Sequence, residues 1–245
     1  TTEIYTLSLH DALPIYLLQV EAYGSPLLHS WLNRDLTLAG RIFYEDKQGQ
    51  IIDDIICLEE IPMIIPELGI HLQRDVKDKG PLVNLQEHML PLYSVGGAEN
   101  QSLDSLLRKR FNYTKLLSFD LMLVPLEAPR FVGIKGEMLA SYRLDNLTSV
   151  HGATCAIATY QDSKTLPITA FFDHEEIGSI SWEGAGSSFI NDILLRIQAF
   201  YSLSAEEFLI LKSRSLCLSL DMAHAMHPMH KEKHDFNHPN LLGGG

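Results

Sequence analysis

Apolar and polar positions divide the chain into a strand-rich first part and an alternating second part. Residues 36–44 and 51–58 are predicted strands, and the polar, glycine-bearing stretch 45–50 between them is typical of a hairpin connection. Residues 68–73 form a third candidate strand, while several prolines and the Gly96-Gly97 pair break the rest of this part into loops. The first part is therefore predicted to be rich in strands.

The second part of the chain alternates between short apolar runs and a helical segment. Residues 121–124 and 168–172 are almost continuously apolar, which is typical of strands that are buried on both faces. Within residues 187–201 the apolar side chains recur at spacings of three and four, which predicts an amphipathic helix. Residues 216–220 follow as another predicted strand. This alternation predicts a layered α/β domain.

Acidic side chains follow several of these apolar segments. Glu175 and Glu176 come shortly after the predicted strand at 168–172, and Asp221 directly follows the last predicted strand. Residues beyond the carboxyl ends of parallel strands line the ligand crevice of an open α/β sheet. We therefore expect Glu175, Glu176 and Asp221 to converge there. Asp145 would join them from the loop that opens the next helix.

Two neighbouring carboxylates in a buried site need a positive partner, because like charges in a dry cleft would raise a carboxyl pKa until one group protonated. A divalent metal meets this need. A mixed set of Asp, Glu and His suits zinc, manganese or cobalt, and a carboxylate can bridge two ions in a co-catalytic site. An isolated acidic pair after a strand is more typical of a solvated loop, and the two further carboxylate motifs strengthen the case for a metal. The residue pattern alone leaves both interpretations open.

Composition narrows the choice of partners and compartment. With 19 basic and 31 acidic residues, the formal net charge is −12, which disfavours nucleic acid and anionic membranes as partners. The cysteines Cys57, Cys155 and Cys217 lack CxxC spacing and lie in apolar surroundings, so we predict buried thiols and no bridges. No stretch approaches the roughly 20 apolar residues of a spanning helix, and no signal-peptide pattern is visible. We expect a cytoplasmic protein.

Five segments, in this order along the chain, resemble the aspartyl aminopeptidases, a family of zinc peptidases. They are residues 31–41 (WLNRDLTLAGR), 68–72 (LGIHL), 143–147 (RLDNL), 173–179 (DHEEIGS) and 221–228 (DMAHAMHP). The resemblance covers roughly the middle half of a complete family member, and both ends of the family pattern are missing. It implies an α/β fold, with a partial, layered zinc-peptidase catalytic domain at 117–245 and a strand-rich dimerisation domain at 16–116 inserted in it. Residues 1–15 fit neither domain and are assigned to a non-family segment.

The resemblance implies a role for each acidic residue of these motifs. Asp145 would bridge two zinc ions, Glu176 would ligate one of them, and Asp221 would ligate the other. Glu175 would be the general base, which takes a proton from the metal-bound water and returns it to the leaving amine. Manganese or cobalt could replace zinc in such a site.

Two histidines gain a role from the resemblance alone. Without it, His224 is as typical of a polar core residue as of a ligand, and His71 is typical of a half-buried, hydrogen-bonded imidazole in an apolar segment. The resemblance implies that both contact the substrate. His71 would reach the active site of a neighbouring subunit, where it would help to stabilise the oxyanion. A dimer-based homo-oligomer is therefore implied as well.

The activity implied by the resemblance is removal of an N-terminal residue, expected to be Asp or Glu, from peptides by metal-activated water. The family's histidine ligands have no counterpart here, and the lysine that would bind an acidic side chain falls beyond Gly245. We therefore expect the literal chain to have little or no activity. The alternative is a non-catalytic homologue, or a truncated fragment that acts only in oligomer assembly. A third option is another dinuclear amidohydrolase with a related core.

Overall fold

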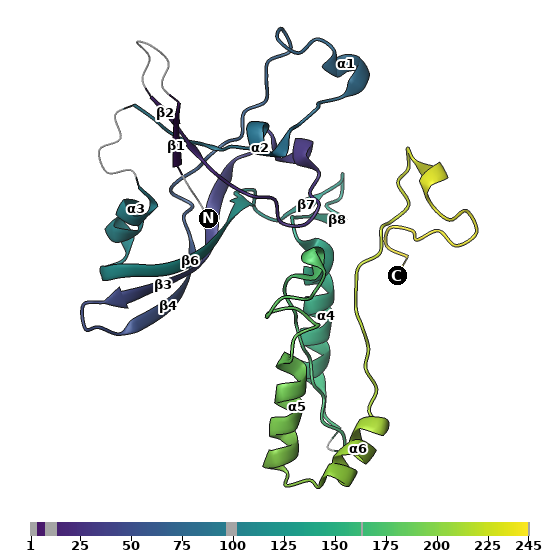
Figure 1. Cartoon of the computed structure of the whole chain (residues 1–245). Coiled ribbons are helices and arrows are strands. Elements are labelled where there is room, and N and C mark those ends of the chain that lie inside the picture. Colours follow the sequence, from purple (N-terminus) through teal and green to yellow (C-terminus); the bar gives the residue numbers. More distant parts are fainter. Residues whose placement is uncertain (1–3, 8–13, 97–101, 163, 245) are drawn as a thin grey trace. The chain divides into compact units, whose positions relative to one another are not determined.

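The computed structural model describes residues 4–7, 14–96, 102–162 and 164–244, and it is a mixed α/β structure with small sheets (Figure 1). It divides into two compact units, residues 1–128 and residues 129–245. The sequence pattern places a domain boundary after residue 116. The structure divides later, because the long strand β6 (Tyr113–Pro125) pairs along its length with a strand of the first unit.

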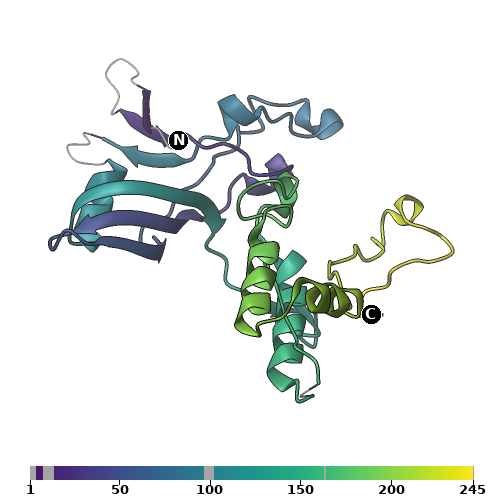
Figure 2. The same cartoon turned by 60° about the horizontal axis from the view of Figure 1, so that its bottom comes forward.

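An antiparallel sheet with the order β4-β3-β6 is the main element of the first unit. Its strands are β3 (Leu36–Asp46), β4 (Ile51–Cys57) and β6, which run side by side in Figure 2. Ile42 of β3 pairs with Asp54 on one side and with Phe119 on the other. The strands predicted at 36–44 and 51–58 are thus confirmed. The strand at 121–124 is also confirmed, but it lies half-buried in β6 at an edge of this sheet.

A tight turn joins β3 to β4, as the polar stretch between them predicts. The Asp46 carboxylate accepts hydrogen bonds from the backbone N–H groups of Gln48 at 2.8 Å and Gln50 at 2.9 Å. Gly49 has a φ of 77°, a left-handed conformation that glycine adopts without a steric penalty. Local hydrogen bonds and one glycine therefore fix the register of this hairpin.

The helix α3 (Leu103–Arg110) covers one face of the main sheet. Ser102 caps its N-terminus, where the Ser102 hydroxyl accepts from the backbone N–H of Ser105 at 3.1 Å. Leu107 is fully buried and packs in the main core together with Ile42 and Leu38 of β3. Hydrophobic burial therefore helps to hold α3 against the main sheet.

Smaller elements complete the first unit. They are β1 (Ile4–Leu7), β2 (Ile15–Leu18), η1 (Leu28–Trp31), α1 (Val76–Lys79), α2 (Leu85–His88) and β5 (Leu92–Val95). β1, β2 and β5 form a second antiparallel sheet in the order β1-β2-β5. The sequence pattern sets residues 1–15 apart. Within them, the strand Ile4–Leu7 pairs with Ile15–Leu18. Residues 1–3 and 8–13 lie outside the described residues.

The strand predicted at 68–73 is wrong. This segment forms turns, in which the backbone N–H of Leu72 donates to the Gly69 carbonyl at 2.9 Å. Leu68 and Leu72 are exposed, and no strand among the described residues pairs with them. An apolar run becomes a strand only where a neighbouring strand satisfies its backbone groups, and this segment has no such neighbour.

Most regular elements of the second unit are helices, and irregular segments connect them. Its elements are β7 (Arg130–Val132), β8 (Met138–Ala140), α4 (Leu144–Thr159), η2 (Glu175–Ile177), α5 (Phe189–Phe200), α6 (Ala205–Ser213) and η3 (Lys231–Lys233). β7 and β8 form a two-stranded hairpin. The helix predicted within 187–201 is confirmed as α5.

The strands predicted at 168–172 and 216–220 are wrong in this structure. Both segments lack strand pairing with any described residue, and Figure 1 draws the chain after α6 as an extended trace and not as a strand. Leu216 is 83% exposed and Phe171 is 51% exposed. The layered α/β arrangement and the inserted domain therefore stay predictions.

Two further expectations concern the cysteines and membranes. Cys57, Cys155 and Cys217 are all free thiols, as predicted, but Cys155 and Cys217 are exposed and only Cys57 is half-buried. The prediction of burial is wrong for these two because the apolar segments around them are themselves uncovered.

Within the described residues, no helix has the length and apolar character needed to cross a membrane.

Candidate active site

Asp145 lies at the start of α4, on a backbone that is not yet helical. Asp145 has φ −85° and ψ 109°, and a cis peptide bond joins it to Asn146. The regular helix follows these two residues, and the backbone N–H of Leu147 donates to the Arg143 carbonyl at 3.1 Å. Asp145 is exposed. As expected, it belongs to the segment that opens a helix.

Glu175 and Glu176 are the first two residues of the short helix η2, and both side chains are exposed. The preceding residue, His174, has a left-handed backbone with φ 59°. The backbone N–H of Gly178 donates to the Glu175 carbonyl at 2.9 Å and closes the turn. The acidic pair is therefore presented by a tight turn that follows the extended segment 168–172.

Asp221 follows the extended segment 216–220, and its carboxylate accepts from the backbone N–H of Met222 at 2.7 Å. One contact links this segment to α4. The Asn146 side-chain amide donates to the Leu220 carbonyl at 3.2 Å. Because Asn146 follows Asp145 and Leu220 precedes Asp221, this hydrogen bond brings the two acidic segments together.

The two histidines lie in different units. His224 is exposed in the loop after Asp221, and the backbone N–H of Met226 in that loop donates to the Asn240 carbonyl at 2.7 Å. His71 is exposed in the turn at 69–72 of the first unit. The half-buried imidazole that the residue pattern suggests for His71 is therefore not observed.

The donor types of these residues suit zinc, but their positions do not. No three His, Cys, Asp or Glu side chains within the described ranges are grouped so that they could hold a metal ion. The expected convergence of Glu175, Glu176 and Asp221 is thus not seen. The physical reason is that the segments before them are not paired in a sheet, so no common sheet edge holds their ends together. The roles of the individual residues stay predictions.

A polar cluster that the sequence pattern does not identify lies in the loop of η2. It consists of His174, Ser181 and Glu183. His174 Nδ1 lies 2.6 Å from Ser181 Oγ and 3.5 Å from Glu183 Oε2. These residues join the two sides of the loop that carries η2. The segment 174–183 consists of turns and one short 3-10 helix, so no helical or strand periodicity in the sequence could have revealed the cluster.

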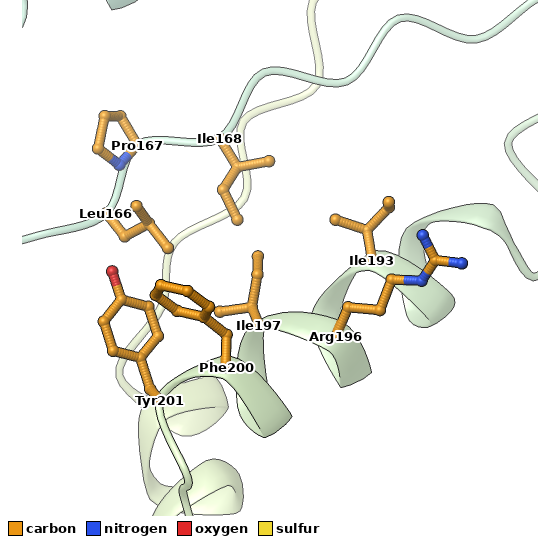
Figure 3. A pocket seen from close by; sticks show the side chains of 8 residues that line it. All are labelled: Leu166, Pro167, Ile168, Ile193, Arg196, Ile197, Phe200 and Tyr201. Atoms are coloured by element: carbon orange, nitrogen blue, oxygen red, sulfur yellow. The ribbon is translucent and has the colours of Figure 1, made fainter.

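An apolar hollow lies elsewhere in the second unit. Leu166 and Ile168 line one side of it, and Ile197 and Phe200 of α5 line the other (Figure 3). Arg196 stands at its margin, and none of the described residues that line the hollow carries a carboxylate or an imidazole. Because its lining is mostly apolar, we interpret the hollow as packing space between α5 and the preceding segment.

The strongest polar contacts of the first unit are structural. The Arg108 guanidinium donates to the Asp104 carboxylate at 2.7 Å and holds the pKa of that carboxyl below its usual range. The Tyr113 hydroxyl donates to the same carboxylate at 2.9 Å. The hydrogen bond from Tyr44 to Asp54, 2.7 Å long, raises the pKa of Tyr44 to about 12. These pairs tie α3, β3, β4 and β6 together.

Comparison with known proteins identifies the class. Residues 7–245 match the Peptidase_M18 model, described as aminopeptidase I zinc metalloprotease (M18), and the chain belongs to this family. The resemblance to the aspartyl aminopeptidases is thereby confirmed, and zinc is the metal that the family description names. The match takes in residues 7–15, which the sequence pattern assigns to a non-family segment.

Curated relatives agree with this membership. The chain is 36% identical over 233 residues to a probable M18 family aminopeptidase 2 of Streptomyces avermitilis, and the match covers 92% of the chain and 53% of the relative. It is 34% identical over 270 residues to aspartyl aminopeptidase 4 of Saccharomyces cerevisiae, with coverage of 92% and 54%. The chain therefore spans about half the length of the curated relatives that it matches.

Solved structures share the fold. A cryo-EM structure of an Ape4 and Nbr1 complex matches with a TM-score of 0.77 and 28% identity, covering 93% of the chain and 48% of the other. A structure described as the mApe1 dodecamer of Saccharomyces cerevisiae matches with a TM-score of 0.74 and 21% identity, covering 93% and 53%. The second likeness is evidence of the fold alone.

Proposed function

We propose that the chain is part of a zinc-dependent aminopeptidase that removes an N-terminal acidic residue, Asp or Glu, from peptides. Membership of the M18 family carries this proposal. The similarity to a yeast aspartyl aminopeptidase supports the acidic preference. Because the chain spans about half of its relatives' length, the proposed activity is that of a protein of the family's full length.

One contact supports the grouping of the acidic residues. The hydrogen bond from the Asn146 side chain to the Leu220 carbonyl is 3.2 Å long and links the residues next to Asp145 and Asp221. This contact supports a placement of Asp145 near Asp221. From the resemblance of their motifs to the family, we assign Asp145 as the bridging ligand, and Glu176 and Asp221 as the ligands of one zinc ion each.

Glu175 is the proposed general base. Its carboxylate takes a proton from the attacking water, whose oxygen bonds to the carbonyl carbon of the first peptide bond. The same group then returns the proton to the amine nitrogen as the carbon–nitrogen bond breaks. Exposure of Glu175 on a tight turn supports this role, because a base must reach both the water and the leaving group.

His224 and His71 are the proposed substrate contacts. His71 sits between Leu68, which is 54% exposed, and Leu72, which is 78% exposed. An exposed apolar turn with one polar side chain is suited to enter a site on another protein surface. We propose that His71 acts in the active site of a neighbouring subunit within a dimer-based homo-oligomer.

The test compares Glu175→Gln with Glu176→Gln in a protein extended to the family's length from the source coding region. Release of N-terminal Asp from a peptide and zinc content are measured for both variants. We expect Glu175→Gln to abolish turnover and keep its zinc, because it removes a base and spares the ligands, and Glu176→Gln to lose both. Loss of zinc in Glu175→Gln would show that the two roles are exchanged. Equal release of neutral residues would remove the acidic preference.

A second candidate function is a non-catalytic homologue, or a fragment that acts only in oligomer assembly. It is favoured by the lack of a grouped metal site among the residues that the structure describes. The literal chain, assayed beside the extended protein, is expected to show little or no activity under the first proposal. An extended protein that forms oligomers without binding zinc or releasing amino acids would favour the second. The cytoplasmic location stays a prediction.

A further inference from the structure

The loop that carries Glu175 and Glu176, residues 173–187, is centred on the ring of His174. The His174 side chain is 20% exposed, although the Glu183 carboxylate beside it is 57% exposed. His174 Nδ1 lies 2.6 Å from Ser181 Oγ and 3.5 Å from Glu183 Oε2. The ring is therefore more buried than the two carboxylates that follow it, because Glu175 and Glu176 are exposed.

Backbone hydrogen bonds close the same loop. The N–H of Asp173 donates to the Glu183 carbonyl at 3.2 Å, and the N–H of Ser179 donates to the His174 carbonyl at 2.9 Å. A Cβ atom added at Gly184 would overlap the backbone of Ser179, so a glycine permits the two sides of the loop to approach. Side-chain and backbone contacts thus hold the same two sides of the loop together.

The combination of serine, histidine and glutamate does not form a hydrolytic triad. In a triad the serine contacts one ring nitrogen and the carboxylate contacts the other. Here Ser181 and Glu183 both approach Nδ1 of His174. A carboxylate would repel the lone pair of an unprotonated Nδ1, so the proton belongs on Nδ1, which donates to Ser181 Oγ and faces Glu183. The cluster is an anchor and not an activated nucleophile.

We propose that His174 is a positioning residue for Glu175 and Glu176, because its contacts with Ser181 and Glu183 fix the turn from which both carboxylates project. The proposal rests on the function proposed above, which gives these carboxylates their roles. His174 has a φ of 59°, which is uncommon for a residue with a side chain. The ring contacts stabilise this conformation, and the direction of the next two Cα–Cβ bonds depends on it.

Substitutions at position 174 separate the backbone from the ring. His174→Gly adopts the left-handed conformation freely but lacks the donor. His174→Asn tolerates the same conformation and restores an N–H donor at the δ position that Nδ1 occupies. Ser181→Ala removes the partner of the donor. The matched control is His238→Ala, which removes an exposed histidine of the same unit that pairs with Asp235 at 3.5 Å.

Amide hydrogen exchange in the chain as it stands gives the first measurement. The N–H groups of Gly178 and Ser179 close the turn through bonds of 2.9 Å to the Glu175 and His174 carbonyls. We expect their protection to fall about 3- to 10-fold in His174→Gly and Ser181→Ala, as for the loss of one hydrogen bond. His174→Asn should recover most of it, and His238→Ala should not change it. Unchanged protection in His174→Gly, or no recovery in His174→Asn, would overturn the proposal.

Cobalt(II) binding, read from visible absorption of the same substitutions in a protein extended to the family's length, distinguishes this proposal from the proposed function. Weaker binding in His174→Gly with recovery in His174→Asn supports both. If the exchange changes as expected and cobalt does not bind even the extended protein without substitutions, the anchoring of the turn stands and the metal role of Glu176 fails. If cobalt binds the unsubstituted extended protein and its His174→Gly variant equally well, the anchor does not position the carboxylates and the proposal is overturned.

Discussion

Gly40 lies in the middle strand of the main sheet, at a point where a side chain has no room. It pairs with Ile56 of β4 and Leu121 of β6, and its φ is 151°. A Cβ atom there would overlap the Asp120 carbonyl oxygen and lie 3.0 Å from the Leu121 Cα atom. The substitution Gly40→Ala should therefore destabilise the first unit through both its backbone and its contact with β6.

The magnitude follows from these two effects. An L-residue forced to this φ costs about 1–3 kcal/mol. Relief of the overlap moves the Asp120 peptide away from β3, and each backbone hydrogen bond lost costs about 0.5–1.5 kcal/mol. The expected loss in free energy of unfolding is about 2–5 kcal/mol. The control is Gly49→Ala, because Gly49 also has a positive φ, of 77°, but an added Cβ would meet no atom within 4 Å. Gly49→Ala should lower the free energy of unfolding by only about 1–2 kcal/mol.

Urea unfolding followed by tryptophan emission measures both variants. Trp31 packs against the second core cluster of the first unit, whereas Trp182 of the second unit is 84% exposed and should change little on unfolding. With a slope of about 2 kcal/mol per molar urea, Gly40→Ala should lower the midpoint by about 1–2.5 M. Equal shifts in Gly40→Ala and Gly49→Ala would show that the overlap with Asp120 has no energetic consequence and would refute the reasoning.

Three further predictions concern packing, pH and the neighbouring subunit. In the same urea assay, Leu107→Ala should lower the free energy of unfolding by about 2–5 kcal/mol, because Leu107 is fully buried. The control Leu72→Ala should hardly change it, because Leu72 is exposed. Equal losses in the two variants would contradict the assigned core. Arg108 lowers the pKa of the Asp104 carboxyl in the folded chain. The ionised carboxylate therefore stabilises the fold fully at pH values above the ordinary pKa of Asp. This stabilisation is lost as the pH falls through the lowered pKa of the folded state. Asp104→Asn should thus be less stable than the unmodified chain at neutral pH, by a small amount because the pair is exposed, and equally stable in acid. In a protein of the family's length, His71→Ala should reduce turnover without changing zinc content, and full activity would exclude its proposed role.

Some of the fold could be predicted because its determinants are local. The hairpin of β3 and β4 follows from two apolar runs joined by a polar stretch with Gly49, and the helix α5 follows from apolar side chains repeated at spacings of three and four. The apolar segments 168–172 and 216–220 look equally regular in sequence. They are not strands here, because a strand exists only through hydrogen bonds to a neighbour that its own sequence does not specify.

The candidate site likewise has features that the sequence determines and features that depend on the tertiary structure. The sequence by itself determined the residue types: carboxylates after apolar segments, and the motifs that identify the M18 family. Only the tertiary structure decided that Asn146 bonds to the Leu220 carbonyl and that His174 contacts Ser181 and Glu183. The physical reason is that chemical type is a property of each residue, whereas distance between residues far apart in the chain depends on how their segments pair and pack.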